Sequence, residues 1–282
     1  MPAPRVRSFM LASILGLCLA QSVWAVPIIV TFEAAGANAA AITATRDAFR
    51  TAVGGGIVAG ANGSFGGLRR EINWDGVPTA QADRNPLPGN FFNVNSPRGV
   101  VFSTPGTGFL VSANAGDSAP ALFGFANEFQ VFSPQRLFTA VNSNVTDVQF
   151  FSPGTSTAAT TSAFGLVFVD VEGAGLTTLQ FFDTNNALIY SRSALVAGNQ
   201  GLSFLGATIT GGSISRVRIT SGLNTIVSNG VLGNPNDDVV VMDDFLYAEP
   251  IQFTAAIPEP STYALMLAGL GALGFVARRR KR

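Results

Sequence analysis

The sequence predicts an all-β ectodomain, an antiparallel β-sandwich of jelly-roll type with one short N-terminal helix, placed between two apolar terminal segments. Short runs of β-branched and aromatic residues recur from about residue 137 onward, and turn-forming residues separate them. Apolar and polar residues alternate within some of these runs, as in a strand with one buried face. The 282 residues are 47% hydrophobic and 12% charged, with 23 Phe, which supplies a sizeable core and argues against disorder.

Residues 1–25 have the layout of a secretory signal peptide. Two arginines precede an apolar run from Phe9 to Ala20, and small residues stand just ahead of Val26. This pattern predicts cleavage by signal peptidase between Ala25 and Val26. An uncleaved membrane anchor is the alternative, but the run is shorter than the ~20 residues that a spanning helix needs. Cys18 lies in this segment, so the processed chain has no cysteine and no disulfide.

One helix is predicted near the start of the ectodomain. Residues 28–32 form a strand candidate, and residues 39–53 then place Ile42, Phe49 and Val53 on one helical face. The glycines that follow Val53 end the helix.

The rest of the ectodomain is predicted to form short strands that turns and loops connect. The short runs lie at residues 99–103, 108–112, 128–132, 145–151, 164–171, 177–182, 187–191, 202–209, 214–220 and 239–247. No linker is rich enough in Pro, Ser or charge to force a boundary, so we expect one domain over residues 26–256. Two domains that divide near residue 135 are the alternative.

The C-terminal segment, residues 257–282, combines three ordered features. Pro258, Glu259 and Pro260 come first, an apolar stretch over residues 264–277 follows, and the chain ends with Arg278, Arg279, Arg280, Lys281 and Arg282. A helix over residues 261–277 is roughly 25 Å long, the short limit for a bilayer core of ~30 Å. The basic residues would stay on the cytoplasmic side. A plain tail anchor is the alternative interpretation.

This order of features closely resembles the PEP-CTERM sorting signal. The resemblance implies processing near Pro258, Glu259 and Pro260 by an exosortase, a membrane-embedded transpeptidase of Gram-negative bacteria that is usually encoded with exopolysaccharide genes. It implies an inner-membrane intermediate, held through the C-terminal helix, and then the cell surface or the extracellular matrix. The resemblance concerns sorting and supplies no activity for the ectodomain. Motifs within the ectodomain, such as Met242-Asp243-Asp244-Phe245, resemble those of uncharacterised PEP-CTERM proteins.

Charge and composition exclude several functions. Ten of the 17 basic residues lie in the ectodomain and all are arginine, whereas 16 of the 17 acidic residues lie there. A domain that is acidic and lacks lysine is a poor partner for nucleic acid. The chain has no histidine, which excludes Ser-His-Asp catalysis and histidine-ligated metals.

One acidic group is a candidate calcium site. Glu33 ends the first strand candidate, and Asp243 and Asp244 lie within the last one. If these strands were neighbours, the carboxylates could share a structural Ca²⁺. Period-two alternation places Asp243 and Asp244 on opposite faces, so only one would reach it. The alternative, which we favour, is a solvated acidic strand edge without a metal, and no other cofactor is expected.

Trp74 is the candidate for glycan contact, because indole rings stack on sugar faces and polar residues surround it in Arg69-Arg70-Glu71-Ile72-Asn73-Trp74-Asp75-Gly76. A buried structural Trp is the favoured alternative.

For the protein as a whole, we expect no catalytic residues and a non-catalytic structural or weakly glycan-binding role, with exopolysaccharide as the candidate partner. The competing hypothesis is a polysaccharide-active glycoside hydrolase that uses a pair of carboxylates.

Overall fold

The structure is a computed structural model that describes residues 27–227, 231–232, 238–253 and 260–280. The predicted cleavage site at Ala25 and Val26 lies outside the described residues. So do Pro258 and Glu259 of the sorting motif and Lys281 and Arg282 of the basic tail.

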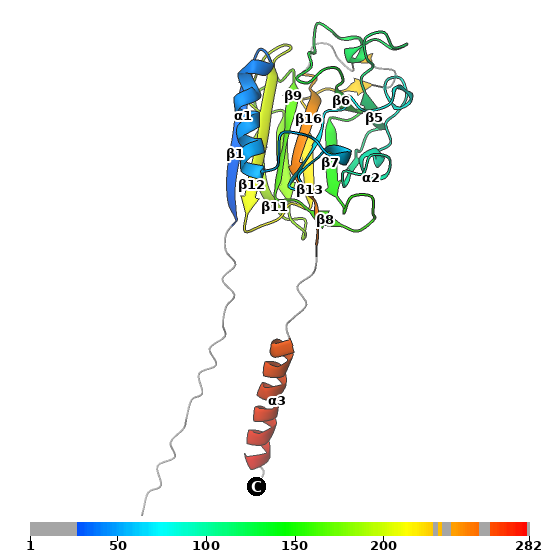
Figure 1. Cartoon of the computed structure of the whole chain (residues 1–282). Coiled ribbons are helices and arrows are strands. Elements are labelled where there is room, and N and C mark those ends of the chain that lie inside the picture. Colours follow the sequence, from blue (N-terminus) through cyan, green and yellow to red (C-terminus); the bar gives the residue numbers. More distant parts are fainter. Residues whose placement is uncertain (1–26, 228–230, 233–237, 254–259, 281–282) are drawn as a thin grey trace, which may run out of the picture.

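The predicted antiparallel β-sandwich is confirmed, and two sheets form it (Figure 1). The larger sheet runs β1 (Ile28–Gly36), β12 (Leu202–Thr210), β9 (Ala163–Val169), β16 (Val241–Ala248), β6 (Phe138–Val141), β14 (Ile226–Val227) and β15 (Val231–Leu232), with β2 (Ser64–Phe65), β3 (Arg69–Ile72) and β5 (Gly108–Val111) attached. The smaller sheet runs β11 (Leu188–Ser193), β10 (Thr178–Phe182), β13 (Arg216–Thr220), β7 (Val145–Phe150) and β4 (Val100–Ser103). Strand β17 (Ile251–Gln252) pairs with β8 (Ala159–Thr160).

Strands from before and after residue 135 lie together in both sheets. In the larger sheet β1 pairs with β12 and β3 pairs with β16. In the smaller sheet β4 pairs with β7. This interleaving is what we expect of one continuous domain.

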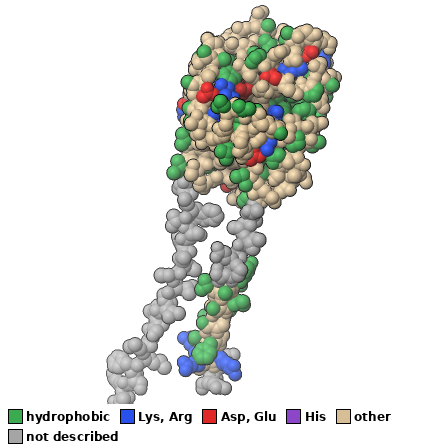
Figure 2. All heavy atoms as spheres, viewed as in Figure 1, with side chains coloured by type: hydrophobic (Ala, Val, Ile, Leu, Met, Phe, Trp, Pro, Cys, Tyr) green, Lys and Arg blue, Asp and Glu red, His purple; other side chains and the backbone are tan. Residues whose placement is uncertain are grey.

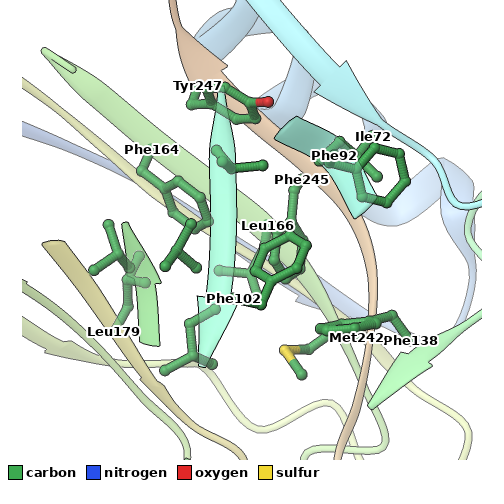
Figure 3. Packing of buried hydrophobic residues seen from close by; sticks show 14 of the residues in the cluster. Ile72, Phe92, Phe102, Phe138, Phe164, Leu166, Leu179, Met242, Phe245 and Tyr247 are labelled. Carbon is green, nitrogen blue, oxygen red and sulfur yellow. The ribbon is translucent and has the colours of Figure 1, made fainter. Parts of the chain in front are cut away.

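The central strands of the larger sheet are buried on both faces, and β9 shows why. Phe164, Leu166 and Phe168 point into the core between the two sheets, which Figure 3 shows from close by. Val167 and Val169 alternate with them and point into a second core on the outer face. A strand buried on both sides reads as a continuous apolar run, which is the pattern of this segment.

Helix α1 (Ala39–Val53) covers the outer face of the larger sheet and confirms the predicted helix. Asn38 caps its start by accepting a hydrogen bond from the amide of Ala41, and Gly54 ends it at a φ of 93°. Phe49 points at Gly206 in β12, where a Cβ atom would lie 3.1 Å from the phenyl ring. A glycine at this position is therefore what lets the helix approach the sheet.

The remaining helical segments are α2 (Phe91–Val94), the 3-10 turns Ala61–Gly63, Thr79–Gln81 and Leu122–Gly124, and α3 (Pro260–Arg280). Helix α3 covers the apolar stretch of the sorting segment and carries Arg278, Arg279 and Arg280 in its last turn. Within the described part of the chain, no helix combines the length and apolar character that crossing a membrane requires. The predicted transmembrane character of the C-terminal helix is therefore not confirmed, although the helix itself is present.

Strand β16 lies in the interior of the larger sheet. It is paired with β9 along one edge and with β3 and β6 along the other. The start of β1 and the end of β16 lie at the same end of this sheet, because β1 and β9 run parallel to each other and β16 runs against both.

Candidate functional site

Trp74 is buried, so the predicted glycan contact at this residue is wrong. Its side chain is 1% exposed. The indole stacks on Phe138 at a centroid separation of 4.0 Å and meets Phe245 edge-on at 5.0 Å. A sugar has no access to the ring, and the favoured alternative of a structural Trp describes its position.

Glu33 is separated from the acidic pair of β16. Its register partner in β12 is Leu205, which pairs with Leu166 in β9, and Leu166 pairs with Phe245 in β16. Three strand spacings of ~4.8 Å place Glu33 about 14 Å from β16. The premise that the first and last strands are neighbours is therefore wrong.

Glu33 serves instead to join the edges of the two sheets. Its carboxylate accepts hydrogen bonds from the Nε and Nη2 atoms of Arg192 in β11, at 2.8 and 2.5 Å. This pairing lowers the pKa of Glu33. Among the described residues, no group of three acidic side chains, with or without Cys or His, is placed to hold a metal ion.

Asp243 and Asp244 lie on the same side of β16, which corrects the prediction that they face opposite ways. The pairing between β16 and β9 shifts between Asp243 and Phe245, so that Asp244 is the additional residue of a β-bulge. A bulge breaks the period-two alternation on which the prediction rested.

Ser133 brings the two carboxylates together. Its hydroxyl lies 3.2 Å from Oδ1 of Asp243 and 2.7 Å from Oδ1 of Asp244. The amides of Phe132 and Ser133 donate to Oδ2 of Asp243. Burial raises the pKa of Asp243 well above its usual value, with a further contribution from the charge of Asp244, and burial also raises the pKa of Asp244.

Asp244 lines a cleft of about 410 Å³ at the outer face of the larger sheet. The polar side chains that define this cleft, which we call the arginine cleft, are Arg46, Arg50, Glu71, Arg98, Ser133 and Asp244. Helix α1, strand β3, the segment before β4 and the bulge of β16 each supply part of it. Figure 2 shows acidic and basic side chains lying next to each other in small groups on the visible face of an otherwise weakly charged ectodomain.

Ion pairs fix the carboxylates of the arginine cleft. Arg50 holds Glu71 through Nε and Nη2 at 2.8 and 2.5 Å, and Nε of Arg69 lies 2.6 Å from Oε1 of the same residue. Nη1 of Arg46 lies 3.7 Å from Oδ2 of Asp244. Both oxygens of Glu71 are therefore occupied by guanidinium groups.

Arg69 also holds the start of the glycine-rich segment, residues 54–67, in which Gly60, Gly63 and Phe65 form one wall of the cleft. Its guanidinium donates to the carbonyl oxygens of Arg50, Gly54 and Gly56 and stacks over the ring of Phe65. The wall is fixed by a buried side chain, since Arg69 is 3% exposed.

Arg98 differs from the other arginines of the cleft. No described residue accepts a hydrogen bond from its Nε atom, which is buried, and no described carboxylate forms an ion pair with its guanidinium. The guanidinium carbon lies 4.9 Å from the centre of the Phe92 ring. Burial lowers the pKa of Arg98, the ionisable group of Tyr247 acts to raise it, and the charge of Arg70 lowers it further.

Sequence reasoning missed the arginine cleft as a site. Arg46 and Arg50 lie one helical turn apart on α1, a spacing that places them on one face, but nothing in the sequence aligns that face with Arg98. The only available signal was the concentration of six of the ten ectodomain arginines before residue 99.

Comparison with known proteins identifies the C-terminal segment alone. Residues 256–281 match the PEP-CTERM protein-sorting motif, as the resemblance of Pro258, Glu259 and Pro260 implied. No curated protein matches the chain. The chain therefore carries the signal of an exported protein that is sorted by exosortase and passes through the membrane on the way to the cell surface.

Proposed function

We propose that the ectodomain is a non-catalytic component of the cell surface or extracellular matrix and that it binds exopolysaccharide in the arginine cleft. The observation that carries the proposal is the cleft itself. Its volume of about 410 Å³ is within the ~300–1,000 Å³ of small-ligand sites. Guanidinium, carboxylate, amide and hydroxyl groups line it, which matches the mixed donors and acceptors of a sugar chain.

The carboxylates of the cleft favour binding over hydrolysis. A glycosidase needs one carboxyl group as an acid and a second as a base or nucleophile. Both oxygens of Glu71 are held by Arg50 and Arg69, and Asp244 is engaged by Ser133 and Arg46. Carboxylates held in this way support a structural role and weigh against the hydrolase alternative.

The route to the surface completes the proposal. Signal peptidase removes residues 1–25, the chain is retained at the inner membrane through the C-terminal segment, and exosortase processes it near Pro258, Glu259 and Pro260. The ectodomain then stays at the cell surface or in the matrix. Neither a cofactor nor nucleic acid takes part.

The experiment is incubation of the exported protein, purified from its producer, with the producer's own exopolysaccharide. Retention of the protein on the polymer without new reducing ends is the expected result. New reducing ends would establish the hydrolase alternative. If the protein is not retained on the polymer and does not cleave it, glycan binding is overturned and a purely structural role remains.

A further inference from the structure

We propose that the arginine cleft recognises a carboxylated saccharide, with the sugar carboxylate bound by Arg98. This inference rests on the proposed glycan binding and names the class of sugar. The attraction for an anionic sugar must come from this cleft alone. The ectodomain as a whole is acidic, with 16 acidic residues against ten arginines, and its net charge repels anions.

The charge pairing within the cleft leaves Arg98 available. Arg50 is paired with Glu71, and Arg46 lies next to Asp47 and Asp244. Arg98 has no carboxylate partner among the described residues, although it lies in the same cleft. A half-buried guanidinium without a counter-ion favours an anion there, since its charge is only partly solvated.

The surroundings of Arg98 hold it ready for a ligand. Its amide donates to the carbonyl of Phe92 at 2.7 Å, and its carbonyl accepts from the hydroxyl of Tyr247 at 2.9 Å. The guanidinium lies over the Phe92 ring and against Gly63, where a Cβ atom would come within 2.9 Å of Nε. These contacts reduce the freedom that binding would otherwise remove.

The remaining groups favour a carboxylate over a phosphate monoester, which carries close to two negative charges at neutral pH. A guanidinium binds a planar carboxylate through two parallel hydrogen bonds. Glu71 and Asp244 in the same cleft repel a group that carries a second negative charge. Asn62, Asn73 and Ser133 line the cleft as well and provide partners for sugar hydroxyls.

The test is isothermal titration of the full-length protein with trigalacturonate and with the same trisaccharide fully methyl-esterified. We expect the acidic trisaccharide to bind, with an affinity that falls as salt increases, and the ester to bind at least about tenfold more weakly, because it lacks the charge that Arg98 contacts. Arg98→Gln should weaken binding of the acid by about tenfold or more. Arg98→Lys retains the charge without the planar fork and should give an intermediate affinity.

The matched control is Arg218→Gln, which removes one positive charge from the smaller sheet, where Arg218 is paired with Asp147. It should leave the affinity within about twofold. Equal binding of acid and ester would overturn the proposed specificity, and so would an unchanged affinity in a folded Arg98→Gln variant.

The outcome with the producer's exopolysaccharide separates this inference from the proposed function. Retention on that polymer without binding of trigalacturonate overturns carboxylate recognition and leaves glycan binding in place. If the protein neither stays on that polymer nor binds trigalacturonate, both glycan binding and carboxylate recognition are overturned. The comparison of acid with ester on the unaltered protein needs no variant, so a folding defect in Arg98→Gln does not leave the inference untested.

Discussion

Trp74 stacks face to face on Phe138, with ring centroids 4.0 Å apart and an angle of 1° between the planes. Phe245 and Phe92 meet the indole edge-on, so that the single Trp of the ectodomain is the centre of an aromatic cluster between the sheets. This packing joins the loop after β3 to β6 and β16, which approach one another from distant parts of the chain.

Loss of this ring should be costly. Trp74→Ala removes a buried aromatic side chain and should lower the free energy of unfolding by about 3–5 kcal/mol, whereas Trp74→Phe should cost less because it retains a ring. Chemical denaturation followed by circular dichroism measures both. A loss below about 1 kcal/mol for the alanine variant would contradict the central role of the indole.

Gly206 in β12 should not tolerate a methyl group. A Cβ atom there would lie 2.9 Å from the Cα of Gly165 and 3.1 Å from the Phe49 ring. We expect Gly206→Ala to destabilise the protein by about 1–3 kcal/mol, because helix α1 must move outward. Gly76→Ala is the control, since nothing lies within 4 Å of a Cβ atom at Gly76. Equal melting temperatures for the two variants would show that the helix has room to move.

Asp170 should make stability depend on pH. Burial raises its pKa from 3.8 to about 7, and nearby Glu172, Glu128 and Asp238 add to the shift. Between about pH 4 and pH 7 the folded protein therefore keeps the proton of Asp170, whereas the unfolded chain has released it. The contribution of Asp170 to the free energy of unfolding therefore falls as pH rises through this range.

Asp170→Asn should remove that dependence. Asparagine keeps the acceptor for the amide of Gln200 and suits the φ of 75° at this position. We expect the variant to match the unaltered protein near pH 4 and to exceed its stability at pH 8 by up to roughly 4 kcal/mol. Asp183→Asn, at the turn after β10, is the control. A constant stability difference across pH would contradict the assignment.

Calcium should not stabilise the ectodomain through Glu33. The carboxylate of Glu33 is held by Arg192 and lies three strands from Asp243. A ligand bound only by the folded state raises the melting temperature, so we expect equal melting temperatures in CaCl₂ and in EDTA. A higher temperature in calcium that disappears in Glu33→Gln would restore the three-carboxylate site.

The sorting motif gives a prediction in cells. Replacement of Pro258, Glu259 and Pro260 by alanine should leave an unprocessed protein in the inner-membrane fraction, because the motif within residues 256–281 is the feature that exosortase recognises. Fractionation and immunoblotting measure this. Normal size and location in the triple variant would contradict processing at the motif.

Local patterns in the sequence predict most strands and helix α1, because each depends on residues close in the chain. Asn38 and the glycines after Val53 bound the helix, and turn residues bound the strands. The strand order is not local. The sequence predicts Glu33 beside the last strand only if the first and last strands are neighbours, whereas β12 and β9 lie between β1 and β16.

The arginine cleft depends on two features that a sequence pattern does not carry. The bulge at Asp244 turns its carboxylate to the same side as that of Asp243, against the alternation of the strand. The approach of α1 to the sheet then brings Arg46 within 3.7 Å of Asp244. Local propensity sets neither the bulge nor the packing of the helix.

The position of Asp244 within β16 has a mechanical consequence. The arginine cleft touches β16 at Asp244, and the strand ends at Ala248, on the side from which the chain continues toward the sorting motif. Tension between a polymer held in the cleft and a cell that holds the C-terminal side would therefore enter β16 in part at Asp244, a few residues before the strand ends. That strand is hydrogen-bonded along both edges, so the load acts as shear on many bonds at once.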